Sequence, residues 1–342
     1  MSGHPTAEEI SKDYNFAGKT ALVTGSIYFR PHAGYDVILD HVALMLSFFF
    51  FFSGANTGIG KETARVLALR GCHVIMGCRS VERGEQARHE IIQGLEEARS
   101  GLLEVMKLDL NSLGGVRDFA DAFAARKNTQ GLHYVIANAG VMQQTRQQTV
   151  EGYEAHFGVN HLAHFLLVLL LIPHLKASAP SRVIIVSSDG HFVPAHVDVE
   201  DYNLKNLDQS NPDMPYLVSK LYNVLFSNEL NRRLQGTGIT CNSLHPGLIR
   251  TDIGRDMTPE EYANVNKTIS ERFNVPILDV HQGAATTLYA VGCPEGATQG
   301  GLYFKECSVV PSSEKSRDEA LAGKLWELSE NLTLVTFPER PV

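Results

Sequence analysis

Gly54-Ala55-Asn56-Thr57-Gly58-Ile59-Gly60, which runs straight into residues 61–67, is the stretch of sequence that decides the fold. Three glycines at this spacing let the backbone pass close to a pyrophosphate and then open a helix, whose free N–H groups and positive dipole hold the phosphates. Ala64 and Leu67 share one face of that helix, and Gly71 is its expected stop. An ordinary turn before a surface helix is the alternative. The stretch predicts a dinucleotide site.

The strand that should feed this loop lies upstream of a foreign-looking segment. Residues 20–25 read Thr-Ala-Leu-Val-Thr-Gly, but residues 26–54 separate them from the rest of the loop. Deleting residues 26–54 restores an uninterrupted strand–turn–helix entry in which Gly25 is the first glycine. Five consecutive phenylalanines, Phe48 to Phe52, are too bulky for a central strand covered by helices on both faces. We therefore expect residues 20–24 in the sheet and residues 26–53 extruded near the phosphate loop.

We interpret the inserted segment as translated intron. Its phenylalanines followed by Ser53-Gly54 can be encoded by a pyrimidine tract running into an acceptor CAG, and Gly25-Ser26 can encode a GT donor. A genuine surface loop is the alternative, since an insertion between adjacent residues costs little closure entropy. Its apolar part, residues 42–52, is shorter than the ~20 residues that span a bilayer. We expect no transmembrane segment there, and contact with a membrane surface is a minor alternative.

Length and composition exclude several classes of protein. A chain of 342 residues can bury a large core, and a formal net charge of -8 argues against a nucleic-acid partner. The five cysteines show neither metal-ligand nor disulfide spacing, so we expect reduced thiols. For His161 and His164, which share a helical face, a core or surface role is favoured over metal ligation. The N-terminus resembles no targeting signal, so we expect a cytoplasmic protein, and a homodimer is left open.

Short apolar strands alternate with helices along the rest of the chain. This pattern predicts one α/β domain over residues 1–342, with a doubly wound parallel sheet and helices on both faces. The expected strands are 19–24, 72–77, 102–108, 133–137, 182–187, 239–244 and 301–304. The expected helices after the glycine loop are 81–98, 112–125, about 151–175, 215–234, 280–291 and a packed C-terminal helix at 316–332.

Tyr216 and Lys220 place a phenol and an ammonium one turn apart on one face of a helix. A nearby cation lowers the pKa of a phenol, so Tyr216 is predicted to exchange a proton with a carbonyl or alcohol near neutral pH. One such pair is expected by chance among eleven tyrosines, so its position carries the prediction. It follows a strand ending Ser187-Ser188, whose hydroxyl can orient a substrate oxygen. It precedes His245-Pro246-Gly247 at a strand edge where open α/β sheets bind ligands.

Taken in order, these motifs resemble the short-chain dehydrogenase/reductase family over nearly the whole chain except residues 26–54. They are Gly-x-x-x-Gly-x-Gly at 54–60, Asp109-Leu110, Asn138-Ala139-Gly140, Asn160 in Val-Asn-His-Leu-Ala-His-Phe, Ser187-Ser188, Tyr216-x-x-x-Lys220 and Pro246-Gly247. The resemblance implies a Rossmann-type fold. Residues 227–234, 282–289, 300–304 and 325–330 resemble the retinol dehydrogenase and WW-domain-containing oxidoreductase branch. We expect no WW module, because one tryptophan cannot supply its pair, and no N-terminal anchor of the kind common in retinol dehydrogenases.

The resemblance also implies residue roles. Tyr216 would be the acid/base, Lys220 would hold the ribose hydroxyls, and Ser188 would polarise the substrate oxygen. Asn160 would support a proton relay through water. Helix caps or turn contacts for the serines, and a buried helix hydrogen bond for Asn160, are the alternatives. The implied cofactor contacts are Gly25, Gly54, Asn56, Gly58, Ile59, Gly60, Arg79, Asp109, Leu110, Asn138, Ala139, Gly140, Tyr216, Lys220, Pro246, Gly247 and Thr251. Asp109 would meet the adenine amino group, unless it only forms a turn.

The end of the second strand indicates the cofactor. NAD binding usually uses an acidic residue there to take the ribose 2′-OH. This strand ends Gly77-Cys78-Arg79-Ser80 without an acid, and Arg79 can pair with a 2′-phosphate. NADP(H) is favoured over NAD(H), unless Arg79 is simply solvated.

The sequence thus predicts an NADP(H)-dependent oxidoreductase, without a metal. It would interconvert an alcohol and a carbonyl on a small lipophilic substrate that is retinoid-, steroid- or aldehyde-like. A catalytically silent binding or scaffold protein is the alternative, because the insertion interrupts the cofactor loop.

Overall fold

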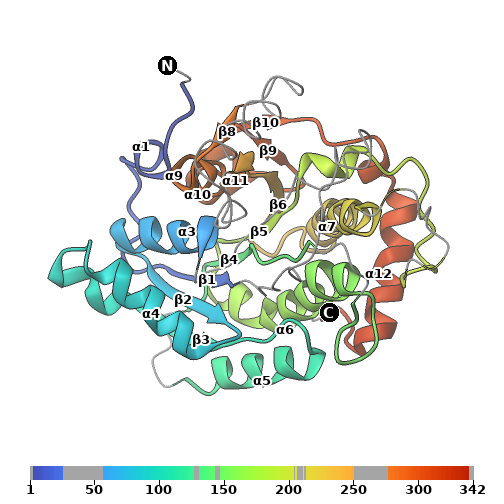
Figure 1. Cartoon of the computed structure of the whole chain (residues 1–342), viewed down its shortest axis with the longest axis horizontal. Helices are drawn as coiled ribbons and strands as arrows, with labels where there is room; N and C mark the ends of the chain where they lie inside the picture. The colour runs from blue at the N-terminus through green and yellow to red at the C-terminus, as the bar shows by residue number, and fades with distance from the viewer. Residues whose placement is uncertain are drawn as a thin grey trace, which may run out of the picture.

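The computed structural model describes residues 3–25, 57–126, 131–142, 147–203, 205, 211, 213–249 and 276–338. Within these residues, one large sheet forms the middle layer of the protein (Figure 1). Its strands are β1 (Thr20–Thr24), β2 (His73–Cys78), β3 (Leu103–Lys107), β4 (Tyr134–Ala137), β5 (Ser181–Val186), β6 (Ile239–His245), β9 (Tyr303–Lys305) and β10 (Ser308–Val310). A separate two-stranded parallel sheet joins β7 (Leu248–Ile249) to β8 (Ile277–Leu278).

The strand order of the large sheet is β10-β9-β6-β5-β4-β1-β2-β3. All neighbours are parallel except the antiparallel β9–β10 pair. The chain starts at β1 in the middle, runs outward through β2 and β3, and returns to β4 on the other side of β1. This reversal confirms the predicted doubly wound, Rossmann-type fold. The switch point between β1 and β4 is where such sheets bind ligands.

β1 is the strand that the sequence places in the centre of the sheet. All five of its residues are buried. Leu22 pairs with Ile75 of β2 on one side and with Val135 of β4 on the other. The expectation that residues 20–24 form the central strand is confirmed. Residues 26–54 lie outside the described residues, so their being an extruded insertion stays a prediction.

Helices cover both faces of the sheet because successive side chains of each strand point to opposite faces. Leu22 packs with α5, α6 and α7, whereas Ala21 and Val23 pack with α3, α4 and α10. The helices are α1 (Ala7–Ile10), α3 (Gly58–Leu69), α4 (Val81–Ile92), α5 (Leu113–Ala124), α6 (Ala163–Ala177), α7 (Met214–Arg233), α9 (Val280–Gly283), α10 (Ala285–Gly292), α11 (Pro294–Thr298) and α12 (Glu319–Thr333). The helix α12 matches the expected C-terminal helix, and its Trp326 is buried.

Several element boundaries differ from the prediction. Instead of reaching residue 98, α4 ends at Ile92, before Gly94, and a 3-10 helix, Glu97–Leu102, follows. Glycine disfavours helix continuation because its backbone loses more entropy than that of other residues. The helix expected at 280–291 is divided into α9 and α10 around Ala284. The strands β7, β8 and β10 were not predicted, since two or three residues carry no apolar period.

A long apolar helix lies inside the protein. The π-helical turn η2 (His156–Leu162) continues directly into α6. Within the described ranges, His156–Ala177 is the one helix that is apolar and long enough to cross a membrane. Of its apolar 18-residue stretch, 83% is buried inside the protein. It packs against strands of the sheet and α5, which is the position of a core helix. His161 and His164 lie on this helix and are buried in the core.

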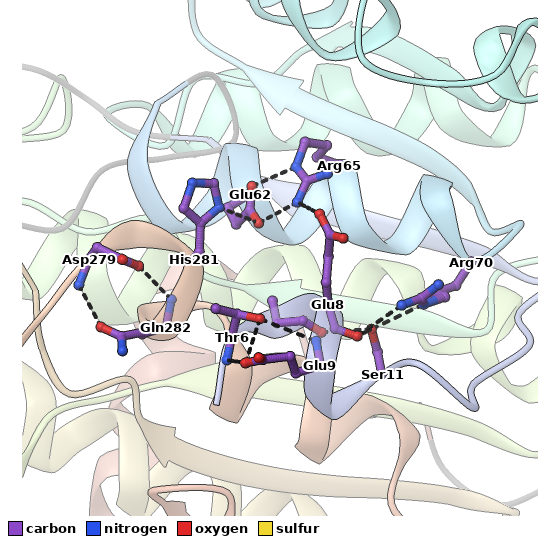
Figure 2. Close-up of polar contacts among 11 residues, drawn as sticks. Thr6, Glu8, Glu9, Ser11, Glu62, Arg65, Arg70, Asp279, His281 and Gln282 are labelled. Atoms are coloured by element: carbon purple, nitrogen blue, oxygen red, sulfur yellow. Dashed lines mark hydrogen bonds and ion pairs between the residues drawn. The ribbon is translucent and has the colours of Figure 1, made fainter. Parts of the chain in front are cut away.

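The N-terminal arm is docked on the glycine-loop helix rather than free (Figure 2). The Glu8 carboxylate on α1 pairs with Arg65 on α3, and Arg65 also pairs with Glu62 at 2.7 Å. Glu62 in turn contacts His281 Nδ1 on α9 at 2.8 Å. The Arg70 guanidinium donates to the Glu8 carbonyl at 2.8 Å. These contacts join α1, α3 and α9.

Candidate active site

Three of the predicted catalytic residues meet at the carboxyl ends of the central strands. Ser188 follows β5, and Tyr216 and Lys220 lie on α7, with all three side chains buried. The Ser188 hydroxyl lies close enough to the Tyr216 phenol to lower its pKa, and Lys220 Nζ lies 5.5 Å from the centre of the Tyr216 ring. The fourth, Asn160 on η2, reaches α7 by donating to Ser219 Oγ at 2.9 Å. The structure therefore brings the predicted set together.

Tyr216 keeps its proton in this environment. Burial raises the pKa of its phenol well above the usual value, the neighbouring Ser188 hydroxyl opposes this, and the Asp213 carboxylate adds to it. The prediction that Lys220 lowers this pKa is therefore wrong for this structure. The main reason is burial of the phenol itself, and burial also lowers the pKa of the Lys220 ammonium to about 7. A fully desolvated phenol beside a partly neutral amine favours the uncharged form.

The structure separates the two neighbouring serines. Ser187 Oγ donates to the Lys220 carbonyl at 2.7 Å, so this hydroxyl ties β5 to α7. Ser188 Oγ accepts the Gly190 N–H at 3.0 Å and caps the 3-10 helix η3 (Asp189–Phe192). A hydroxyl that accepts one bond still has a hydrogen to donate. Ser188 is therefore the serine placed to serve Tyr216 or a substrate oxygen.

Asn160 bonds across elements rather than along its own helix. Its Oδ1 accepts the Val141 N–H at 2.7 Å, and its Nδ2 donates to the Val141 carbonyl at 3.0 Å. Ser219, which Asn160 also contacts, donates to the Tyr216 carbonyl at 2.7 Å. Asn160 thus connects the segment after the Asn138-Ala139-Gly140 turn to the Tyr216 helix.

Thr24 is a site residue that the sequence analysis missed. Its Oγ1 accepts the N–H groups of Asn138 and Ala139, each at 3.0 Å, and lies 3.0 Å from His164 Nε2. His164 Nδ1 in turn lies 3.2 Å from the Asn160 carbonyl. The end of β1 therefore fixes the turn after β4. No local pattern could have found contacts between residues more than one hundred positions apart.

The predicted cofactor residues that are described line the same edge of the sheet. Gly58 opens α3 with a positive φ of 53°, and the N-cap Thr57 makes no side-chain cap bond among the described residues. Among the described residues, the first amides of α3 are therefore left for an anion. A Cβ added to Gly140 would lie 3.4 Å from both Asn160 Oδ1 and Lys220 Nζ. These features fit a dinucleotide. Gly54, Asn56 and Thr251 lie outside the described residues.

The remaining cofactor residues take simpler positions. Gly25 N–H donates to the Gly77 carbonyl at 2.6 Å, and Gly247 has a φ of 104°. Asp109 Oδ1 accepts the Asn111 N–H at 3.0 Å, so Asp109 at least forms a turn. The other members are buried Ile59, Gly60, Leu110 and Pro246, and Arg79, half-buried directly after β2. No cluster that could hold a metal ion occurs in the described part of the chain.

Asp213 and His245 add electrostatic features that the sequence did not reveal. Asp213, three residues before Tyr216, is buried, and burial raises the pKa of its carboxyl to about 6, with His156 opposing the shift. Burial lowers the pKa of the His245 imidazole to about 4, although Asp189 opposes this. Their positions relative to Tyr216 and Ser188 come from the tertiary fold.

A buried phenol, amine and serine at the carboxyl edge of a doubly wound sheet define an oxidoreductase of the alcohol–carbonyl class. The profile described as short chain dehydrogenase matches residues 50–199. Retinol dehydrogenase 11 of Mus musculus is 39% identical over 282 residues, which cover 82% of this chain and 84% of that protein. The WW domain-containing oxidoreductase of Gallus gallus is 41% identical, covering 96% and 72%. The chain belongs to the short-chain dehydrogenase/reductase family, whose members act on CH–OH donors with a nicotinamide cofactor.

Solved structures agree with this assignment. An uncharacterized protein from Mycobacterium paratuberculosis is 31% identical, with a TM-score of 0.68, covering 95% of this chain and 97% of that one. L-Sorbose reductase from Gluconobacter frateurii, solved with NADPH and L-sorbose, is 16% identical with a TM-score of 0.61, covering 85% and 96%. The second likeness shows the fold alone.

Proposed function

We propose that this protein is an NADP(H)-dependent oxidoreductase that interconverts an alcohol and a carbonyl on a small lipophilic substrate. The observation that carries the proposal is the buried Ser188–Tyr216–Lys220 cluster at the carboxyl edge of the sheet. A water-excluded site with a neutral phenol suits proton donation to a carbonyl oxygen.

Each residue of the cluster has a role in the proposed reaction. A bound nicotinamide supplies or takes the hydride. Tyr216 donates its proton to the carbonyl oxygen in reduction and takes it back in alcohol oxidation. Ser188, whose acceptor position is used by Gly190, donates a hydrogen bond to the same oxygen. Lys220 holds the ribose hydroxyls, and Asn160 keeps the turn after β4 in register with α7.

The proposed preference for the phosphorylated cofactor rests on two cations. Arg79 follows β2 where NAD-binding proteins usually carry an acid. Lys61, in the first turn of α3, forms an ion pair with Glu90 of α4. That pair keeps its ammonium on the side of α3 that faces α4. Both cations suit a 2′-phosphate.

The proposed substrate class follows from the relatives, several of which are named retinol dehydrogenases. We propose a retinoid-, steroid- or aldehyde-like molecule and a cytoplasmic reaction, which the five unpaired cysteines support. Protein and NADPH or NADH are titrated by fluorescence, and turnover is then measured with all-trans-retinal and nonanal. NADPH binding with turnover supports the enzyme. A protein that folds but neither binds NADPH nor reduces either probe is the silent binding protein.

A further inference from the structure

The 3-10 helix η3 places Ser188 against the rest of the site. Ser188 is buried, and both its hydroxyl and its carbonyl are engaged by η3. The hydroxyl accepts from Gly190, and the carbonyl accepts the His191 N–H at 3.1 Å. The position of Ser188 Oγ therefore depends on what holds η3.

His191 holds η3 from inside. Its imidazole is fully buried, with Nδ1 2.7 Å from the Ser188 carbonyl. Its Nε2 accepts the Ser313 N–H at 3.0 Å. A carbonyl can only accept and an N–H can only donate, so these two partners require the neutral ring with hydrogen on Nδ1. Burial lowers the pKa of His191, in keeping with that form.

The support behind His191 leads back to the Tyr216 helix. Ser313 Oγ accepts the Ser316 N–H at 3.2 Å. The Ser316 carbonyl accepts from Asn228 Nδ2 on α7 at 2.8 Å. Ser188 and Tyr216 are thus joined by a second route that passes through a distant C-terminal segment.

The strand β9 anchors η3 from the other side. The Tyr303 hydroxyl donates to Asp189 Oδ1 at 3.1 Å, and Lys305 Nζ lies 2.8 Å from Asp189 Oδ2. The Tyr303 ring also packs on His191, with ring centres 4.7 Å apart. Asp189 and His191 of η3 therefore both contact residues 303–316, which are remote in sequence.

We propose that His191 is a positioning residue for Ser188, and that residues 303–316 complete the active site by fixing His191. The inference rests on the role of Ser188 in the proposed function. A catalytic hydroxyl must stay within about 0.5 Å of its productive place, and a supporting hydrogen bond to its own carbonyl serves that need. None of these supporting residues touches the reacting atoms.

Two substitutions separate the hydrogen bond that His191 donates to Ser188 from the one that it accepts from Ser313. His191→Asn puts an amide N–H near the Nδ1 position and can still donate to the Ser188 carbonyl, whereas His191→Gln keeps an acceptor toward Ser313. In NADPH-dependent reduction of all-trans-retinal, we expect His191→Gln to lower kcat about tenfold or more. His191→Asn should keep kcat within about threefold of the parent, and both variants should keep the parent Kd for NADPH.

Control variants distinguish positioning from loss of stability. His133, whose Nδ1 accepts the Thr20 N–H at 3.2 Å at the far end of the sheet, is changed to Asn and should keep the parent kcat. Asn228→Ala removes the outer support without altering a buried ring, and should lower kcat at least about twofold with NADPH binding retained. Asn228→Ala therefore provides the test of the proposal if the His191 variants do not fold.

The outcomes separate the two proposals. Equal kcat in His191→Asn and His191→Gln, or parent kcat in Asn228→Ala when the His191 variants do not fold, overturns the positioning role. Ser188→Ala is measured in parallel. A parent enzyme without turnover, or Ser188→Ala with undiminished turnover, overturns the proposed function and this inference with it. An inactive Ser188→Ala beside His191 variants with parent kcat overturns this inference alone.

Discussion

Replacing Thr24 by valine should destabilise the protein by a predictable amount. The Thr24 hydroxyl accepts two buried backbone N–H groups, from Asn138 and Ala139, and faces His164 Nε2. His164 Nδ1 is directed at the Asn160 carbonyl, so Nε2 is assigned as an acceptor and the hydroxyl as its donor. Valine has nearly the same shape and leaves no cavity. The loss is therefore confined to hydrogen bonds.

A buried polar group without a partner costs about 1–3 kcal/mol. The Asn138 N–H keeps the Ile136 carbonyl as a partner at 3.0 Å, so valine orphans the Ala139 N–H and the imidazole nitrogen. At about 1–3 kcal/mol each, these two groups predict a loss of roughly 2–6 kcal/mol, a large share of the ~5–15 kcal/mol that stabilises a domain. Urea unfolding followed by the fluorescence of Trp326 measures it. Thr287→Val is the matched control, because Thr287 Oγ1 is buried with no partner among the described residues. If both variants unfold within about 0.5 kcal/mol of the parent, the hydrogen-bond argument is refuted.

The remaining predictions concern the chemistry, the cofactor, pH and the insertion. Tyr216→Phe should lower turnover by about 10²-fold or more without moving the urea midpoint, and near-parent turnover would sink the assignment. Arg79→Asp should shift selectivity from NADPH toward NADH by about tenfold, whereas an unchanged ratio of kcat/KM values counts against Arg79. Burial lowers the pKa of His164 and His245 from 6.5 to about 4, so protonation favours the unfolded chain. Above pH 6.5 these two histidines do not reduce the free energy of unfolding. That free energy falls by about 1 kcal/mol per histidine on reaching pH 5.5. Equal urea midpoints at pH 7.5 and pH 5.5 would contradict this prediction. Deleting residues 26–54 should raise solubility and NADPH affinity, and a deletion variant that binds no better argues against the intron interpretation.

Much of the fold could be predicted because local sequence patterns indicate its helices and strands. The apolar run of β1, the glycines before α3 and the alternation of strands and helices are periodic signals that survive without tertiary information. The ends of α4 and the division between α9 and α10 were missed because boundaries depend on capping and packing. The antiparallel strand β10 was missed because three residues carry too little pattern.

The site residues could be named from the sequence, but their electrostatics could not. The order of motifs located Ser188, Tyr216 and Lys220, which the structure brings together. The sign of the Tyr216 pKa shift depends on burial and on Asp213, and neither follows from the spacing of Tyr216 and Lys220. The Thr24 contacts also depend on the tertiary fold and not on local sequence spacing. Each joins residues that approach only when β1 and β4 pair.

The fold and the phosphate site differ in how much they depend on residues 26–54. On one side of that segment, Gly25 extends the pairing of β1 with β2, and the Thr24 hydroxyl is bound by the turn after β4. On the other side, α3 is held by its own buried face against β1 and β2. Strand and helix are thus positioned by packing rather than by the link between them, and a longer link adds little closure entropy. Among the described residues, no side-chain cap supports the amides at the start of α3. Excision should therefore act on cofactor affinity first and on stability second, and the reverse order would mean that residues 26–54 pack as part of the domain.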